Sequence, residues 1–186
     1  MRTTDPALRQ ARNAVAVVFA CNGFAFSSWV ARIPEVRATL GLTPGQLGVL
    51  LLAVSCGSLV ALPTAGSWVH RFGASRVLAW SAVADAIGLA VVGVGTGLLT
   101  EAWAVAIGLL TFGLGSATWN VAMNVEGAAV ERGLARTVMP RFHAAFSVGT
   151  VAGAAAGAAA SRLDVGLEVH LVTTSVLVLA VPASAV

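Results

Sequence analysis

Six long runs of apolar residues, almost free of charge, dominate the pattern along the chain. Charged residues are absent from 13–31, 38–70, 102–125, 142–161 and 169–186. The remaining run, 77–100, contains one charge, Asp85. A stretch of about 18 or more apolar residues can cross a bilayer as a helix, whereas membrane β-strands alternate in polarity over about ten residues. The pattern therefore predicts an all-α transmembrane protein, a bundle of six helices.

We place the six spans at 12–31, 45–67, 76–97, 101–124, 141–161 and 167–185, within one domain that covers 1–186. Lipid offers no partner for free backbone N–H and C=O groups, so helices are expected in each span. The run 38–70 is one span with a polar lead-in. Pro44 and Gly45 fit the start of its helix, because an N–H in the first turn has no helical partner to lose.

The composition supports a membrane location. Hydrophobic residues make up 58% of the chain and charged residues 10%, against about 25% charged residues in a soluble domain. The net charge of +3 comes with eleven basic residues, all arginine, most of which lie beside the apolar runs. This is the pattern of membrane topology signals, and it argues against a nucleic-acid partner.

Arginine is distributed unevenly between alternate connections. With the N-terminus inside, the inner segments contain Arg2, Arg9, Arg12, Arg71, Arg76, Arg132, Arg136 and Arg141, and the outer loops contain Arg32, Arg37 and Arg162. Cytoplasmic loops carry the excess of basic residues in membrane proteins. We therefore expect both ends of the chain to lie in the cytoplasm.

Motifs of enzymes are missing from the sequence. It contains no Gly-x-Ser-x-Gly, no His-Glu-x-x-His and no phosphate-binding Gly-x-x-x-x-Gly-Lys segment, and its two cysteines lack metal-ligand spacing. The sequence predicts neither an enzyme nor a self-contained ATP-driven pump, and it gives no reason to expect a cofactor or a metal site.

Small residues recur at helical spacing in two spans. Gly149, Gly153 and Gly157 follow one another at intervals of four in the fifth span. The second span repeats the pattern more weakly with Gly57, Ala61 and Ala65. Such ridges let a neighbouring helix approach backbone to backbone, so these residues are predicted to pack helices.

The connection between the second and third spans contains a motif. Gly66 is followed by His70-Arg71, then by Gly73 and Arg76. This segment resembles the signature of the major facilitator superfamily, in which Asp-Arg follows the first glycine; here His70 stands at the acidic position. The resemblance implies a cytoplasmic loop that helps to lock one conformation, although a charge-pair lock does not carry over to His70. In the alternative interpretation the arginines only anchor the topology.

A second resemblance covers 120–127, Val130-Glu131, Met139-Pro140, His143 and 146–149, together with the outer segment 29–34. These residues are similar to a fucose-permease-like branch of the superfamily, in particular to members in the bacterial inner membrane. The branch implies secondary active transport of a small polar solute, with a sugar as the analogy.

The superfamily implies an architecture as well. Two six-helix halves enclose the solute near the midplane of the bilayer, and each half consists of two inverted three-helix repeats. The first three and last three spans would be those repeats. Their equivalent turns, 71–73 between the second and third spans and 162–166 between the fifth and sixth, show weak similarity. Because no arginine follows Arg162, we expect an N-terminal half whose partner is a C-terminal six-helix half. A self-assembling six-span channel or carrier and a non-transporting membrane interaction protein are the alternatives.

Polar residues inside the spans are candidates for solute binding. Asn120 and Asn124 share a face of the fourth span, and Asn22, Phe26 and Trp29 share a face of the first. The family resemblance implies that these two spans line the central cavity. Two other interpretations stay open: buried amides also bond neighbouring helices, and aromatic residues at span ends also anchor the interface.

Three titratable residues are candidates for coupling or gating. An ionised carboxylate at Asp85 would cost on the order of 3 kcal/mol in mid-bilayer, so Asp85 is either a proton-coupling acid or a structural hydrogen-bonding group. Glu126 and His143 flank the expected inner connection between the fourth and fifth spans. Glu126 is expected to pair with a nearby arginine and to shape the inner gate together with His143.

Overall fold

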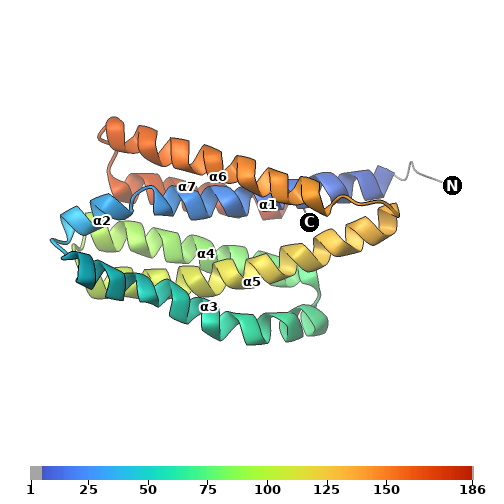
Figure 1. Cartoon of the computed structure of the whole chain (residues 1–186), viewed down its shortest axis with the longest axis horizontal. Helices are drawn as coiled ribbons and strands as arrows, with labels where there is room; N and C mark the ends of the chain where they lie inside the picture. The colour runs from blue at the N-terminus through green and yellow to red at the C-terminus, as the bar shows by residue number, and fades with distance from the viewer. Residues whose placement is uncertain (1–5, 186) are drawn as a thin grey trace.

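Seven helices make up the fold in the computed structural model, which describes the backbone of residues 6–185 and the side chains of residues 6–180 (Figure 1). They are α1 (Pro6–Val30), α2 (Ile33–Thr39), α3 (Pro44–Phe72), α4 (Ala74–Gly97), α5 (Ala102–Leu134), α6 (Met139–Arg162) and α7 (Leu167–Ala185). No strand occurs within the described backbone. The all-α transmembrane class predicted from the apolar runs is therefore confirmed.

Five helical segments are long and apolar enough to cross a membrane: Pro6–Thr39, which comprises α1 and α2, and the helices α3, α4, α5 and α6. The sixth expected span is α7, whose part with described side chains, Leu167–Ala180, is a shorter apolar helix. α1 begins at Pro6 rather than near 12, and α3 ends at Phe72 rather than near 67. Two further differences from the expected spans have a structural cause. The first is a separate short helix, α2, which follows α1 after a break at Ala31 and Arg32 and carries a proline in its first turn.

The second difference is the length of α5, which continues to Leu134 rather than stopping near 124. Polarity ends the membrane-crossing part of a helix, but it does not end the helix. Glu126, Glu131 and the alanines between them favour helix and carry α5 beyond the apolar run. Ala135 then ends it in the left-handed conformation, with φ 51°. Glu126 consequently lies inside α5 and does not flank a loop.

The connection between α3 and α4 is a single residue. Gly73 has φ +86°, a conformation that side chains disfavour. Gly66, His70 and Arg71 therefore lie on α3, and Arg76 lies in the first turn of α4, so the expected loop is mostly helical. α3 begins at Pro44, which lies in its first turn.

Helix pairing reveals two inverted repeats. The main pairs are α1 with α6, α3 with α5, α4 with α5, α1 with α7, α4 with α7 and α1 with α5. Exchanging α1 with α5, α3 with α6 and α4 with α7 leaves this set unchanged. Exchanged helices also run in opposite directions along the bundle (Figure 1). Helices α1 to α4 thus form one repeat, and α5 to α7 form the other.

The pairing of α1 with α6 depends on glycine. A Cβ atom on Gly149 would overlap the backbone of Ala20, and one on Gly23 would overlap the carbonyl of Phe146. Gly153 lies against Phe24 in the same way. The two backbones are therefore in direct contact, as small residues at intervals of four allow.

The pairing of α3 with α5 repeats this geometry residue by residue. Gly57 lies against Leu110, and Gly113 lies against Val54. The shift of 90 that takes Gly23 to Gly113 also takes Ala20 to Leu110, and a shift of 92 takes Gly57 to Gly149 and Val54 to Phe146. The inverted repeat is thus preserved at the level of single contacts.

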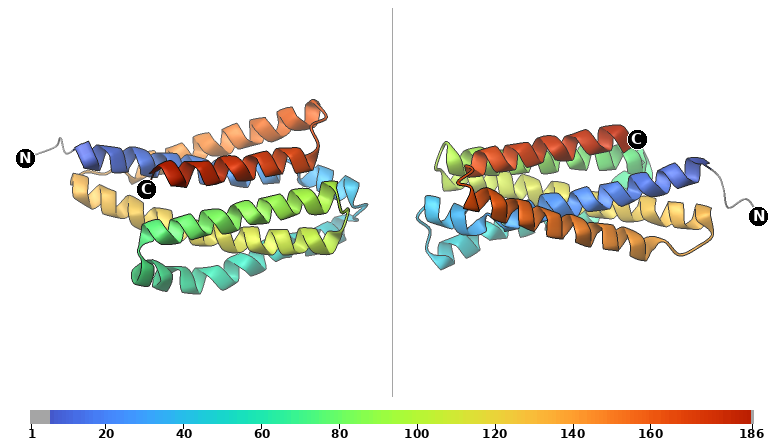
Figure 2. Two further views of the ribbon diagram at one scale, coloured as in Figure 1. Left: turned by 180° about the vertical axis from the view of Figure 1, so that it is seen from behind. Right: turned by 90° about the horizontal axis from the view of Figure 1, so that it is seen from above.

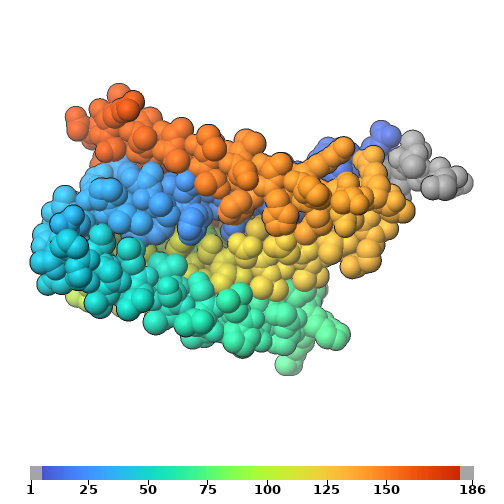
Figure 3. All heavy atoms as spheres, in the orientation of Figure 1, coloured from blue at the N-terminus to red at the C-terminus, as the bar shows by residue number. Residues whose placement is uncertain are grey.

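The bundle has two unlike faces. Helices α6, α1, α5 and α3 lie side by side on the face seen in Figures 1 and 3. Seen from behind, α7 and α4 cover the opposite face (Figure 2), and the core lies between the layers around Phe19, Leu89 and Phe112. Of the five long spans, α3 and α6 are the least buried.

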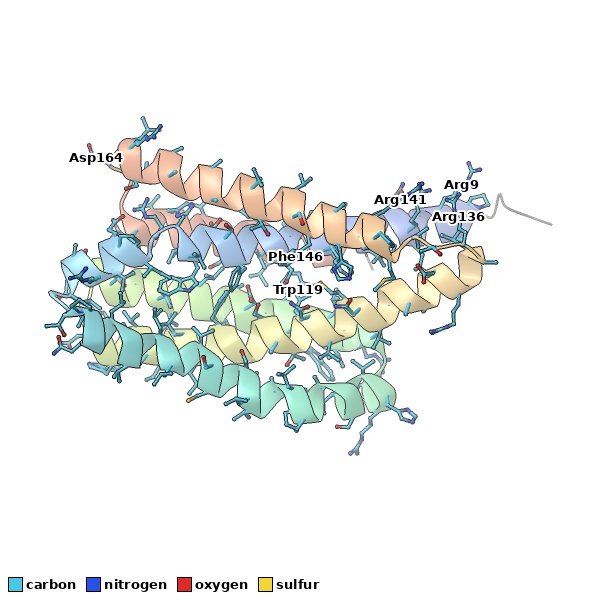
Figure 4. All side chains as sticks on the ribbon, viewed as in Figure 1. Arg9, Trp119, Arg136, Arg141, Phe146 and Asp164 are labelled. Atoms are coloured by element: carbon cyan, nitrogen blue, oxygen red, sulfur yellow. The ribbon has the colours of Figure 1, made fainter. Side chains whose placement is uncertain are left out.

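Charges gather at the two ends of the bundle. Arg9, Arg136 and Arg141 lie at one end and Asp164 at the other (Figure 4). The turn between α3 and α4 is at the end of the bundle where α1 begins (Figure 1). The arginines assigned to inner segments thus share one end, apart from Arg2, which lies outside the described residues. Assigning that end to the cytoplasm remains a prediction.

The glycine contacts predict an asymmetric response to added methyl groups. Gly149→Ala should destabilise the protein by on the order of 1–3 kcal/mol, because its Cβ would overlap the Ala20 backbone. Gly48→Ala is the matched control, since a Cβ there meets nothing within 4 Å. Thermal unfolding of purified protein in detergent measures both. Equal melting temperatures for the two variants would contradict backbone contact at Gly149.

Candidate functional site

A polar hollow of about 260 Å³ opens on the face formed by α1, α3, α5 and α6. Each of these helices contributes to it. The lining residues are Asn22, Phe26, Val54, Ser58, Phe112, Ser116, Ala117, Asn120 and Phe146. Its helices are the four seen on the surface in Figure 3. The structure thus brings together three of the predicted binding residues, Asn22, Phe26 and Asn120.

The hollow lies where the two repeats meet. By the shifts established for the glycine contacts, Asn22 is equivalent to Phe112, Phe26 to Ser116, and Val54 to Phe146. Both members of each pair line the same hollow, so it sits on the pseudo-two-fold axis that relates the repeats. Transporters with inverted repeats bind their solute at the repeat interface near the midplane.

The repeats contribute unlike side chains to this axis. Where one repeat has the amide of Asn22, the other has the ring of Phe112, and where one has Phe26, the other has the hydroxyl of Ser116. The backbone is therefore nearly symmetric, but the surface that a solute would meet is not. Such a site can orient a solute that has a polar and an apolar side.

Amides form the polar part of the hollow. Asn120 Nδ2 donates to Asn22 Oδ1 at 3.5 Å, and Asn124 Nδ2 donates to the carbonyl oxygen of Asn120 at 2.8 Å. Asn22 is 1% exposed, and its Nδ2 has no hydrogen-bond partner among the described residues. Ser58 donates to the carbonyl of Gly113 at 3.2 Å. Asn124 extends the amide row towards the arginine-rich end but does not line the hollow.

Aromatic rings form the apolar part. Phe26 is 43% exposed, and Phe146 lies on α6 facing α5 across the open face (Figure 4). Phe112 closes the floor and is fully buried. Sequence reasoning missed Val54, Ser58, Phe112 and Phe146 as site residues. The shift of 90 residues between the repeats takes Asn22, a candidate on the first span, to Phe112. This relation is the signal in the sequence that would have found Phe112.

Trp29 lies apart from the hollow. It is 2% exposed and packs in the core, whereas Phe26, one turn earlier, lines the hollow. The 90-residue shift takes Trp29 to Trp119, which is also fully buried. The two indoles are therefore equivalent core residues of the two repeats. Trp29 was grouped with the binding residues because its spacing from Asn22 and Phe26 places it near the same face of the helix.

Asp85 is fully buried where α4 packs against α5. A Cβ on Gly115 of α5 would lie 2.9 Å from the Asp85 Cα atom. Neither carboxylate oxygen has a hydrogen-bond partner among the described side chains or backbone. The hydrogen bond across helices expected for a structural Asp85 is thus not formed here. The residue does not line the hollow.

The gating candidates on α3 and α4 lie at the arginine-rich end. Arg71 places its guanidinium carbon 5.3 Å from the centre of the Phe72 ring, and Phe72 packs edge-on against Trp80. His70 and Arg71 are exposed. A Cβ atom on Gly66 would meet nothing within 4 Å, so this position is open to a partner surface.

The candidates on α5 and α6 are separated from one another. Glu126 lines a second pocket between α1, α4 and α5, and no ion pair forms between it and the described arginines, contrary to expectation. His143 lies edge-on to Phe19 with ring centres 5.4 Å apart. Glu131 instead shapes this end, because its Oε2 accepts from the backbone N–H groups of Val138 and Met139 at 2.7 and 2.8 Å.

A buried arginine fixes the opposite end of the bundle. Arg32 is 1% exposed. Its Nη2 donates to Glu35 at 2.9 Å and to the carbonyl oxygen of Val165 at 2.7 Å. The break between α1 and α2 is thereby joined to the turn between α6 and α7, so this side chain connects the two repeats.

No group of three or more potential metal ligands occurs among the described residues. The fold and the hollow define a multi-pass α-helical membrane protein with a polar site on its repeat axis.

Comparison with known proteins indicates a class of membrane protein. No protein-family model matches the chain. Curated relatives do match, and they are named as transporters or membrane proteins.

The chain is 33% identical over 162 residues to an uncharacterized transporter of Sinorhizobium fredii, covering 87% of this chain and 42% of the relative. It is 31% identical over 138 residues to an uncharacterized MFS-type transporter of Yersinia pestis, covering 74% and 35%. It is 29% identical over 150 residues to a membrane protein, MosC, of Rhizobium meliloti, covering 81% and 36%. The chain thus spans about two fifths of the length of these relatives. The similarity supports an MFS-type membrane transporter.

The hollow predicts a pattern of aqueous access. In a background without Cys21 and Cys56, Asn120→Cys should react with a membrane-impermeant maleimide in membrane preparations, because position 120 lines the open hollow. Ala86→Cys is the control, since Ala86 is 1% exposed in the core, and it should stay unlabelled until denaturation. Labelling of both positions at the same rate would contradict the site.

Proposed function

We propose that this chain is the N-terminal six-helix half of a major facilitator superfamily transporter, which moves a small polar solute across a bacterial inner membrane by alternating access. The single observation that carries the proposal is the polar hollow on the repeat axis. It opens on the face formed by α1, α3, α5 and α6. A second six-helix half on that face would complete a cavity around the solute.

The chemistry of the hollow supports a small polar solute, with a sugar as the leading example. Asn22 and Asn120 offer both donors and acceptors, and Ser58 and Ser116 add hydroxyls. Phe26 and Phe146 supply flat apolar surfaces. No arginine, aspartate or glutamate lines the hollow, so the residues of this half favour a solute without net charge at the contacts that they make.

The length of the relatives supports a second half. They extend well beyond the matched region, since this chain covers 42% of the first relative and 35% of the second. The uneven distribution of arginine between the two ends supports an N-terminus in the cytoplasm. With that orientation the connection at Gly73 faces inwards, and Gly66, His70, Arg71 and Arg76 act at an inner gate together with Glu126 and His143.

Transport tests the proposal directly. Proteoliposomes with the complete protein should accumulate a radiolabelled member of a panel of monosaccharides and other small solutes. Asn120→Ala should lower kcat/KM about 5- to 150-fold, because it leaves the buried amide of Asn22 without its partner, at a cost of about 1–3 kcal/mol. Thr111→Val is the control on the same helix, since the Thr111 hydroxyl bonds only to Ile107 of its own helix.

Several outcomes would count against this function. Equal kcat/KM values for Asn120→Ala and Thr111→Val would show that Asn120 does not contribute to solute binding. Flux through a self-dimer of this chain alone would favour a six-span channel or carrier. A complete protein that transports none of the panel would favour a membrane interaction protein.

We further propose that a proton drives the solute and that Asp85 carries it. Asp85 is the one acidic residue of the described chain that lies deep within a span, where ionisation is expensive. Asp85→Asn should abolish uptake driven by a pH gradient while leaving exchange of solute down its own gradient. Both rates are measured in the same proteoliposomes. Unchanged dependence on the pH gradient would exclude Asp85 as the carrier.

A further inference from the structure

Two buried polar groups on contacting helices lack partners. The carboxylate oxygens of Asp85 on α4 are one, and the indole Nε1 of Trp119 on α5 is the other. Both residues are fully buried, at 0% exposure. Burying a polar group without a hydrogen bond is unfavourable, because the group loses its bonds to water and gains none in return. The indole is a donor only and an ionised carboxylate an acceptor only, so the two groups are chemically complementary.

The packing register places the two residues one helical turn apart along the bundle. Helices α4 and α5 are antiparallel, with Gly88 against Phe112 and Asp85 against Gly115. Trp119 is one turn beyond Gly115 on the same side of α5. The equivalent step on α4 runs from Asp85 back to Ser81.

The direction of side chains on a helix brings the two groups together. Long side chains lean towards the N-terminus of their helix. Trp119 therefore leans back towards Gly115, the residue against which Asp85 packs. Asp85 in turn leans towards Ser81, the residue level with Trp119. Because the helices are antiparallel, the two side chains lean towards each other.

Other donors near Asp85 are already used. Ser81 donates to Leu78 at 2.9 Å, and Thr118 donates to Leu114 at 2.8 Å. On α7, which also packs against α4, Ser175 donates to Leu171 at 2.8 Å. Among the described residues, the ion pair in the structure is that of Arg32 with Glu35, at one end of the bundle. Trp119 is the buried free donor next to Asp85 on its main partner helix.

We propose that Trp119 Nε1 and the Asp85 carboxyl group form a hydrogen-bonded pair inside the bundle, reached by a rotation of these side chains. The pair makes Trp119 a positioning residue. It holds the rotation of α5 about its axis, and the next residue, Asn120, then faces the hollow. This last consequence rests on the proposed function, whereas the pairing itself does not.

Infrared spectroscopy of the complete protein tests the pair. The side-chain carboxyl band of Asp85 is identified by its loss in Asp85→Asn. In Trp119→Phe this band should shift to higher frequency, because the indole hydrogen bond is lost while an aromatic ring is kept. Trp29→Phe is the matched control, since Trp29 is the equivalent buried indole of the other repeat, and it should leave the band in place.

Each result decides the pairing independently of transport. A band that is unmoved in Trp119→Phe, or that moves instead in Ser81→Ala, would overturn the proposal. If Trp119→Phe does not fold, the reciprocal measurement applies: the indole N–H band in resonance Raman spectra should change in Asp85→Leu. No change there would also overturn the pair. A confirmed pair in a protein without transport would leave the pairing standing and reject only the proposed function.

Discussion

Direct contact between helix backbones at glycine is the interaction on which this structure depends. At Gly149 and Gly57 a single Cβ atom would overlap the neighbouring helix. Lipid tails are as apolar as leucine, so burying apolar surface between helices gains little within a bilayer. Close packing must replace that driving force, and it is strongest where the backbones touch. The pairs α1 with α6 and α3 with α5 are therefore held at their glycine contacts.

These contacts also fix the repeat axis, and the axis fixes the hollow. The glycine contacts of the two repeats are related by constant shifts in residue number. Equivalent residues on α1 and α5, and on α3 and α6, therefore line the same hollow. Divergence of the side chains at those positions, an amide opposite a ring, then creates a polar site without disturbing the symmetric backbone. The buried groups behind the hollow, Asp85 and Trp119, belong to the contact of α4 with α5 and do not face the open side.

The sequence was sufficient to predict the helices and their class, since charge-free apolar runs of this length match the thickness of a bilayer. It was not sufficient to predict where helices stop, because residues such as Glu126 continue a helix outside the apolar run. For the candidate site, helical periodicity grouped residues by shared faces, and Asn22, Phe26 and Asn120 from those groups line the hollow. Trp29 was grouped with them but lies in the core, since residues three positions apart on one face can point to the core or to the cavity. Helical periodicity could not find Phe146, because that placement depends on how α6 packs against α1.

On the proposed function, the face formed by α1, α3, α5 and α6 encloses a solute path. A structure of the complete protein in a lipid bilayer tests this most directly. We expect a second six-helix half to cover this face, with water or solute density in the hollow between Asn22 and Asn120. Ordered lipid acyl chains packed against Asn120 and Ser58, with the rest of the chain on α4 and α7, would contradict it.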